Sequence, residues 1–360
     1  MKAEAHGALT PMSRCMSDES IKRRAIKGFK FPLGVYPVEV MTPQEGYTSE
    51  FEPADGDEGM DGMVEVEAWP DRYVYDIVIS TPRLEALWVQ VFAMMPGRIY
   101  PILDYIGHDR YREIDPYIAY EPIGQERITN FLQRYRDFFF EDGMVGFGAV
   151  SEEPFFYSFV DEHKILTIRI EPELRPKLEK LLAAFDLAPI DEPAGADAAA
   201  HEHRSVLMTS NERPDLLNAD EIVELARESW GLVLNIDPET NLDDDGNELG
   251  ITYFRCLLRY STDQKPTAQY AEVICTAECM LQAESMALQA ADDLIDQVES
   301  ENEISDLLLM SADRIFPEDV SAENINSKTW KSLSRKHLQS AQILSARWIF
   351  DEAGSDPQSN

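Results

Sequence analysis

The chain has 360 residues, of which 44% are hydrophobic, and it carries 67 acidic against 32 basic residues for a formal net charge of -35. The apolar fraction excludes a disordered chain, and the negative field repels nucleic acid and anionic membrane surfaces, so we expect neither as a partner. No run approaches 18 uninterrupted apolar residues, and the four cysteines have no regular spacing, which is typical of reduced thiols in a cytoplasmic protein.

A chain of this length predicts two domains. Changes in composition along the chain predict an α/β domain over 31–187, with a mobile acidic loop at 50–62, and an α+β domain over 215–350, joined by a linker over 188–214. They also predict a flexible basic lead over 1–30 and a disordered tail over 351–360. Met12 and Met16 are alternative starts to Met1.

The first domain is expected to begin with strands at 63–69 and 72–80. A helix follows, because Ser80-Thr81-Pro82 offers a cap and an early proline, and apolar residues then recur at helical spacing up to Pro96. The next strand is expected at 98–105. This order of strand, helix and strand favours a parallel or mixed sheet with a helix on one face.

The rest of the first domain is predicted as a helix over 124–140, strands over 144–150, 155–160 and 165–170, and a helix over 171–185. In the second domain we expect a helix from Asn218, strands over 232–236, 251–260 and 268–275, and long helices over 276–298 and 322–350. The fold class predicted is therefore mixed α/β (α+β), with a mixed sheet in one domain and a small antiparallel sheet with two long helices in the other.

A run of acidic side chains resembles the first half of an EF-hand calcium loop. Asn241, Asp243 and Asp245 alternate and are followed by Gly246, so their oxygens could surround Ca²⁺. The position where that loop has a bidentate glutamate is Thr252, and the flanks are predicted strands. A polar hairpin turn is the alternative.

Two cysteines and two histidines are a candidate zinc site. Cys275 and Cys279 are spaced to share a helix face, and His201 or His203 could complete the ligand set. The alternative is that both cysteines are small buried apolar residues.

Asp161-Glu162-His163 places an imidazole beside two carboxylates, which could make a general base. The trio also fits a turn between two strands, and we favour the turn. Gly143, Gly146 and Gly148 have the wrong spacing for a phosphate-binding loop.

No catalytic motif or cofactor fingerprint is recognisable, and no cofactor is expected apart from the calcium alternative. We therefore expect a non-catalytic cytoplasmic binding or regulatory protein whose acidic surface takes a basic protein as its partner. The alternative is a hydrolase-like enzyme that uses carboxylates and a divalent metal. The basic segments at 22–30 and near the C-terminus are expected to dock onto the acidic surface of the chain itself.

Overall fold

The computed structural model describes residues 14–54, 69–209, 213, 215–262, 269–298, 304–320 and 340–349. They divide into two units, one within 1–106 and 115–235 and the other within 107–114 and 236–360. Four predicted segments fall wholly or mostly outside the described residues. They are the strand at 63–69 except Trp69, most of the acidic loop at 50–62, the tail, and the part of the last helix over 322–339.

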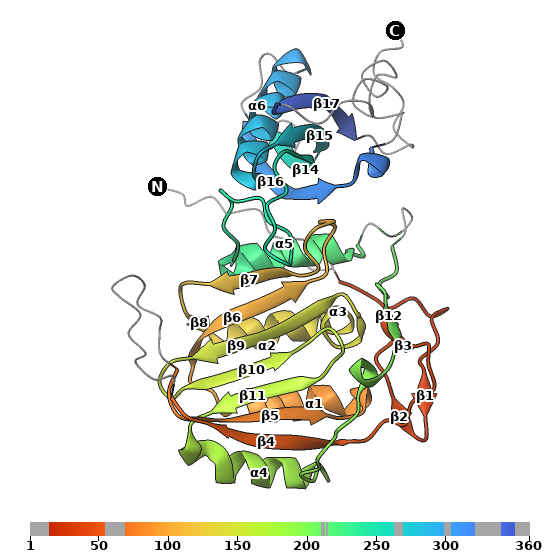
Figure 1. Ribbon diagram of the computed structural model, residues 1–360, viewed down its shortest axis with the longest axis vertical. Coiled ribbons are helices and arrows are strands. Elements are labelled where there is room, and N and C mark those ends of the chain that lie inside the picture. Colours follow the sequence, from red (N-terminus) through yellow and green to blue (C-terminus); the bar gives the residue numbers. More distant parts are fainter. Residues whose placement is uncertain are drawn as a thin grey trace, which may run out of the picture. The chain divides into compact units, whose positions relative to one another are not determined.

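The first unit is built on a nine-stranded sheet (Figure 1). Its strands are β4 (Gly46–Glu52), β5 (Arg72–Val78), β6 (Arg98–Tyr105), β7 (Asp115–Ala119), β8 (Ile123–Gly124), β9 (Val145–Ser151), β10 (Phe156–Val160), β11 (Leu166–Ile170) and β13 (Leu232–Leu234). Their order across the sheet is β13-β7-β6-β9-β10-β11-β5-β4, and β8 pairs with β6. The strands expected at 144–150, 155–160 and 165–170 are confirmed.

The mixed α/β class is confirmed, but the pairing differs from the parallel or mixed sheet that was expected. Every pairing between strands in the described residues is antiparallel. Strands β5 and β6, which flank the first helix, do run in the same direction, because four antiparallel steps through β11, β10 and β9 separate them. The sequence therefore correctly indicated that the connection from β5 through α1 leads to a strand of the same direction. It did not indicate that β11, β10 and β9 lie between β5 and β6 in the sheet.

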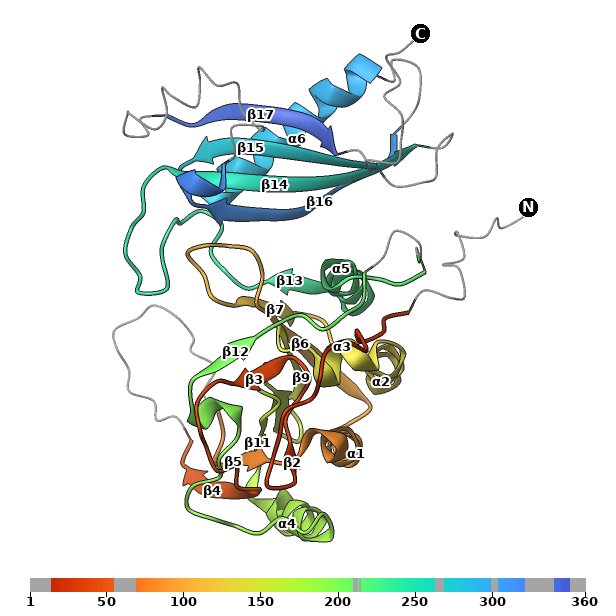
Figure 2. The same ribbon diagram turned by 90° about the vertical axis from the view of Figure 1, so that its right-hand side faces the viewer.

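Five helices accompany the sheet: α1 (Thr81–Phe92), α2 (Gln125–Arg134), α3 (Arg136–Glu141), α4 (Arg175–Ala184) and α5 (Ala219–Trp230). Figures 1 and 2 show α1, α2 and α3 on one face of the sheet, where the predicted apolar stripe of α1 is buried. The helix expected over 124–140 is interrupted at Tyr135 (φ -114°, ψ 37°). This break reorients the chain so that Phe138, Phe139 and Phe140 all become buried.

Two short ribbons lie outside the large sheet. One pairs β1 (Ala25–Ile26) with β2 (Phe29–Lys30), and the other pairs β3 (Val35–Pro37) with β12 (His201–His203). Short 3-10 turns are found at η1 (Pro172–Leu174) and η2 (Ala196–Ala198). The segment 188–214, expected as a linker, thus contributes β12 and η2 to the first unit.

The second unit has a four-stranded antiparallel sheet of order β16-β14-β15-β17 with helix α6 (Met280–Val298). The strands are β14 (Thr252–Thr262), β15 (Gln269–Ala277), β16 (Ile304–Ile315) and β17 (Gln342–Ile349), and a 3-10 turn η3 (Pro317–Asp319) follows β16. Alanines of α6 pack on β14 and β15, and their small side chains permit close approach of helix and sheet. A helix is present in the region expected over 276–298, but it begins at Met280 because Thr276 and Ala277 belong to β15, and the helix expected over 322–350 is wrong at β17.

The loop 107–114, which follows β6, belongs to the second unit and is held there by a buried ion pair. Asp109 accepts hydrogen bonds from the backbone and guanidinium of Arg314 at 2.9–3.0 Å, and both residues are less than a tenth exposed. None of the helices in the described residues combines the length and apolar character needed to cross a membrane.

Candidate metal centre

Two of the six histidines of the chain lie on the short ribbon beside the large sheet. His201 and His203 are separated by one residue on β12, so their side chains share a face of the strand. Strand β3 fixes this face, because His201 pairs with Pro37 and His203 with Val35. Both rings are half-buried.

A third histidine comes from the turn between β10 and β11. The amide of Lys164 donates to the carbonyl of Asp161 at 3.1 Å, and the amide of Ile165 donates to the Asp161 carboxylate at 2.7 Å. Lys164 takes a left-handed conformation (φ 68°) that closes the turn. The turn predicted for Asp161-Glu162-His163 is therefore present, and it presents His163 to the ribbon.

The three imidazole rings converge through the same nitrogen. The Nε2 atom of His201 lies 3.0 Å from Nε2 of His163 and 2.9 Å from Nε2 of His203. The ring centroids are 4.7–4.8 Å apart and the ring planes cross at 73–79°. The lone pairs of three Nε2 atoms can therefore point to one place.

The outward nitrogens have acceptors that fix the tautomers. Nδ1 of His201 lies 2.7 Å from the carbonyl of Ala199, and Nδ1 of His203 lies 2.7 Å from the carbonyl of Gly143. A carbonyl can only accept, so both Nδ1 atoms carry the proton and both Nε2 atoms of the neutral rings carry a lone pair. Nδ1 of His163 likewise faces carboxylate oxygens of Asp161 at 3.4 Å and Glu162 at 3.3 Å.

When all three rings are neutral, no proton lies between the facing Nε2 atoms. Lone pairs 2.9–3.0 Å apart repel each other unless a cation lies between them. Zn²⁺ binds imidazole nitrogens at about 2.0–2.1 Å, so ligand nitrogens lie about 3.3 Å apart at the tetrahedral angle and about 2.9 Å apart at a right angle. Outward Nδ1–H groups bound to carbonyl or carboxylate oxygens are also the usual support of metal-binding histidines. The alternative occupant of this position is a proton on one of the rings.

Three backbone segments meet directly behind His203. The Gly143 amide donates to the carbonyl of Arg204 at 3.2 Å, and the Arg204 amide donates to the carbonyl of Gly34 at 2.9 Å. A Cβ atom on Gly143 would lie 2.2 Å from the Gly34 carbonyl oxygen, and one on Gly34 would lie 2.0 Å from the Gly143 nitrogen. Both positions therefore need glycine for close backbone approach.

The glycines of the Gly-Met-Val-Gly-Phe-Gly run have packing roles. A Cβ atom on Gly146 would lie 2.8 Å from the Phe159 ring, and one on Gly148 would lie 2.2 Å from the Ser158 carbonyl oxygen. Gly143 lies in the junction behind His203, so at each of the three glycines a neighbouring group approaches closer than a Cβ atom would allow.

A buried carboxylate ties the chain after the ribbon to the sheet. Asp142 is fully buried and accepts hydrogen bonds from the Val206 amide, the Ser205 hydroxyl and the Met144 amide at 2.8–3.0 Å. Burial raises the pKa of Asp142, and these bonds together with the Lys164 charge oppose the rise. Burial in turn lowers the pKa of Lys164 to about 8, although Asp142 opposes this, and the Lys164 ammonium donates to the carbonyl of Val145 at 2.5 Å.

The charge environment acts differently on the individual rings. Burial lowers the pKa of His163, but hydrogen bonding to Asp161 and the nearby carboxylates outweigh this, so the net shift is upward. Burial lowers the pKa of His203, and its histidine neighbours act in the same direction while its bond to Gly143 opposes them. The pKa values of two rings in one cluster are thus shifted in opposite directions, as happens where several groups compete for one proton or cation.

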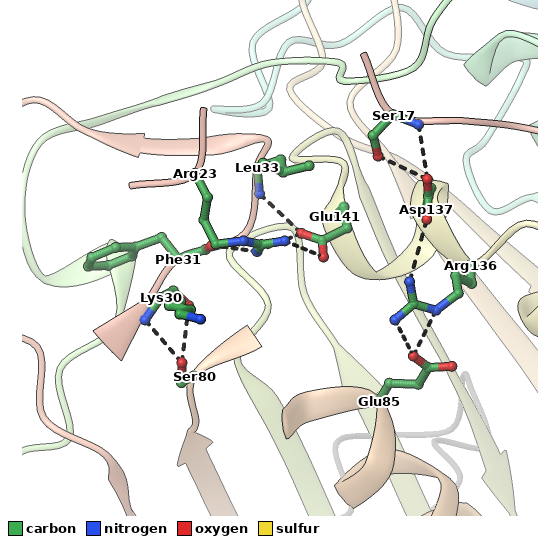
Figure 3. A network of polar contacts seen from close by, with 10 residues as sticks. All are labelled: Ser17, Arg23, Lys30, Phe31, Leu33, Ser80, Glu85, Arg136, Asp137 and Glu141. Atoms are coloured by element: carbon green, nitrogen blue, oxygen red, sulfur yellow. Dashed lines mark hydrogen bonds and ion pairs between the residues drawn. The ribbon is translucent and has the colours of Figure 1, made fainter. Parts of the chain in front are cut away.

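The N-terminal segment holds the ribbon against the helices (Figure 3). Arg23 makes two hydrogen bonds to the Glu141 carboxylate at 2.7 and 2.8 Å, and the same carboxylate accepts from the Leu33 amide at 3.2 Å. Asp137 accepts from the amide and the hydroxyl of Ser17 at 2.9 and 3.1 Å. Arg23 of the basic segment 22–30 is therefore paired with an acidic side chain of the chain itself, Glu141.

The other candidate ligands are placed as follows. Asp243 accepts hydrogen bonds from the amide and the side chain of Asn247, and the Asn241 side chain donates to Gly250 and Thr252, all within the loop and the start of β14. Calcium binding by Asn241, Asp243 and Asp245 stays a prediction. Cys275 and Cys279 belong to the second unit, whereas His201 and His203 belong to the first, where His163 joins them.

All three histidines were recognisable in the sequence as candidate site residues, but in two separate sites. A His-x-His pair on an extended segment was the available signal, because alternate strand residues share a face. Its third partner is 38 residues away in the sequence, and only the turn between β10 and β11 brings it close.

Comparisons of the chain with protein-family models, with curated proteins and with solved structures found no match.

Proposed function

We propose that this chain is a metal-dependent hydrolase-like enzyme in which His163, His201 and His203 bind one Zn²⁺ ion. The observation that carries the proposal is the convergence of three Nε2 atoms whose rings are each oriented by an acceptor at Nδ1. Imidazole is a preferred ligand for Zn²⁺, and neutral rings with a protonated Nδ1 are the form that binds it.

The number of ligands favours a catalytic ion. Structural zinc sites have four protein ligands, whereas catalytic sites have three and keep a position for water. In the part of the chain that the structure describes, the three Nε2 atoms have no fourth ligand atom grouped with them. A bound Zn²⁺ ion would lower the pKa of a water ligand to about 7 and so supply a nucleophile at neutral pH.

The site is accessible and also well supported. The His163 side chain is 18% exposed, so solvent reaches it, while the Gly34, Gly143 and Arg204 junction holds the ribbon in position. Support of ligands by backbone contacts is the arrangement that keeps a metal centre in a fixed geometry.

The proposal is tested by hydrolysis of 4-nitrophenyl acetate by metal-free and Zn²⁺-loaded protein. We expect a rate that requires Zn²⁺ and that falls at least about tenfold in His163→Ala and His203→Ala, because each loses one of three ligands. His108→Ala, which changes a histidine in the second unit, is the matched control and should retain the rate. Binding of Zn²⁺ without any zinc-dependent hydrolysis would contradict the enzyme proposal.

A non-catalytic acidic binding protein is the second candidate, and the net charge of -35 supports it. Its partner would be a basic protein bound by exposed carboxylates, so the complex should dissociate as salt rises. A pull-down washed at low and then high salt tests this candidate, and recovery of no stoichiometric basic protein at either salt would contradict it.

A further inference from the structure

Lys164 occupies a position that is unfavourable for lysine in two respects. It follows His163 in the turn between β10 and β11, where its backbone is left-handed (φ 68°), a conformation that favours glycine or asparagine. The residue is also only 3% exposed, although an ammonium group is costly to remove from water. The turn needs only the backbone of Lys164, so the burial of its side chain requires another explanation.

The side chain of Lys164 joins this turn to the beginning of β9. The ladder between β9 and β10 ends where Phe147 pairs with Val160, so Val145 lies beyond the last paired residue on that side of the strand. The Lys164 ammonium donates to the carbonyl of Val145 at 2.5 Å and so adds a hydrogen bond past the end of β10. On its other side Val145 pairs with Tyr105 of β6, and it is fully buried, so the lysine is attached to a fixed point of the sheet.

The same short segment of the chain also holds His203. The carbonyl of Gly143 accepts from Nδ1 of His203 at 2.7 Å, and a single residue separates Gly143 from Val145. Lys164 follows His163 directly, so a contact that fixes Lys164 also limits where the imidazole of His163 can lie. The segment is thus attached to the ribbon at one end and to the turn at the other.

We infer that Lys164 is a positioning residue of the metal centre, whose ammonium holds the turn against β9 so that His163 reaches the ion bound by the other two histidines. This role rests on the proposed function. His201 and His203 lie on one face of one strand and keep their spacing without the turn, whereas His163 has to be brought to them from another part of the chain. Lys164 is itself a cation and cannot stabilise the ion by its charge, so its contribution is the position of the turn.

The test measures the Zn²⁺ affinity of the full chain by competition with a chromophoric chelator. Lys164→Met keeps a side chain of similar length but removes the ammonium, and we expect an affinity loss of about tenfold or more. The loss should not exceed that of His163→Ala, because the lysine acts only through this ligand. Lys27→Met is the matched control, since Lys27 also has a left-handed backbone (φ 50°) but is exposed, and it should leave the affinity unchanged.

A double-mutant cycle separates positioning from a general loss of stability. In the His163→Ala chain, where one ligand is already absent, Lys164→Met should cause no further loss of Zn²⁺ affinity. An equal loss in both backgrounds, or an affinity of Lys164→Met like that of the unchanged chain, would overturn the inference while leaving the three-histidine site intact. If Lys164→Met does not fold, Lys164→Gly takes its place in the same cycle, because glycine adopts the left-handed conformation of the turn without strain. If the unchanged chain does not bind Zn²⁺, the proposed function itself falls, and the inference with it.

Discussion

The Nε2 atoms of His163 and His201 lie 3.0 Å apart although the residues are 38 positions apart in the sequence. Carbonyl and carboxylate oxygens hold the proton of each ring on Nδ1, so the two facing nitrogens carry lone pairs. The fold therefore maintains a contact that is unfavourable for two neutral rings and favourable once a cation is shared between them.

This relationship predicts a specific change in histidine NMR spectra. Addition of one equivalent of Zn²⁺ should shift the Nε2 resonances of His163, His201 and His203, while their Nδ1 atoms stay protonated. The Nε2 resonance of His108 serves as the internal control and should not shift. Loss of the Nδ1 protons on metal addition would contradict the ligand assignment.

Gly143 links the backbone junction to the metal site. In Gly143→Ala, the new methyl group would lie 2.2 Å from the Gly34 carbonyl oxygen, so the two segments must separate. We expect a loss of about 2 kcal/mol or more in the free energy of unfolding of the first unit, measured by urea denaturation, and at least about a tenfold loss in Zn²⁺ affinity.

The matched control for this change is Gly97→Ala. A Cβ atom there meets nothing within 4 Å, so both stability and metal affinity should stay close to those of the unchanged chain. If Gly143→Ala behaves like the control, the junction does not position His203.

Asp104 predicts a pH dependence of stability. Burial, aided by the charge of Glu162, raises the pKa of Asp104 from 3.8 to about 6. Because this pKa is higher in the folded chain, the favourable contribution of the protonated form is complete below pH 3.8 and is lost as pH rises through about 6.

Asp104→Asn should therefore raise the free energy of unfolding near neutral pH, by roughly 1–2 kcal/mol after allowance for partial exposure, and should change it little near pH 4. Urea denaturation at the two pH values measures this. A variant that is destabilised equally at both would indicate that the carboxylate makes a favourable contact in its charged form.

The ion pair of Asp109 and Arg314 is expected to protect backbone amides of the second unit from hydrogen exchange. Asp109→Asn leaves a buried guanidinium without its charged partner, which costs about 3–5 kcal/mol. Hydrogen exchange should accelerate in peptides from β14 and β16, since Arg314 lies on β16 and pairs with Phe254 on β14. Peptides from β9 to β11 of the first unit are the control and should keep their protection.

Local signals in the sequence were sufficient for α1, α4, α5 and the strands β5, β6 and β9 to β11, whereas β4 and β7 of the same sheet were not predicted. Ser80-Thr81-Pro82 correctly marked the start of α1, and Asn218 with Glu221 forms the capping box that begins α5. These features depend on residues a few positions apart. All of β17 was assigned to a helix because Ala341, Leu344 and Trp348 are also compatible with helical spacing. Pairing with β15 instead makes residues 342–349 a strand.

The candidate site could be predicted only in pieces. His201 and His203 were identifiable as a pair, and the turn at Asp161-Glu162-His163 was correctly recognised. The approach of this turn to the histidine pair depends on backbone contacts between Gly34, Gly143 and Arg204. No local sequence pattern predicts these contacts. Strand β16 was not predicted at all, although it supplies Arg314 to the second unit.

The most direct test of the three-histidine centre is X-ray absorption at the zinc edge of the protein loaded with one equivalent of Zn²⁺. We expect three imidazole nitrogens at about 2.0–2.1 Å and an oxygen as the fourth ligand. His163→Ala should reduce the imidazole contribution, and His108→Ala should leave it unchanged. Sulfur at about 2.3 Å would instead indicate Cys275 or Cys279 as ligands, and that result would contradict the three-histidine centre.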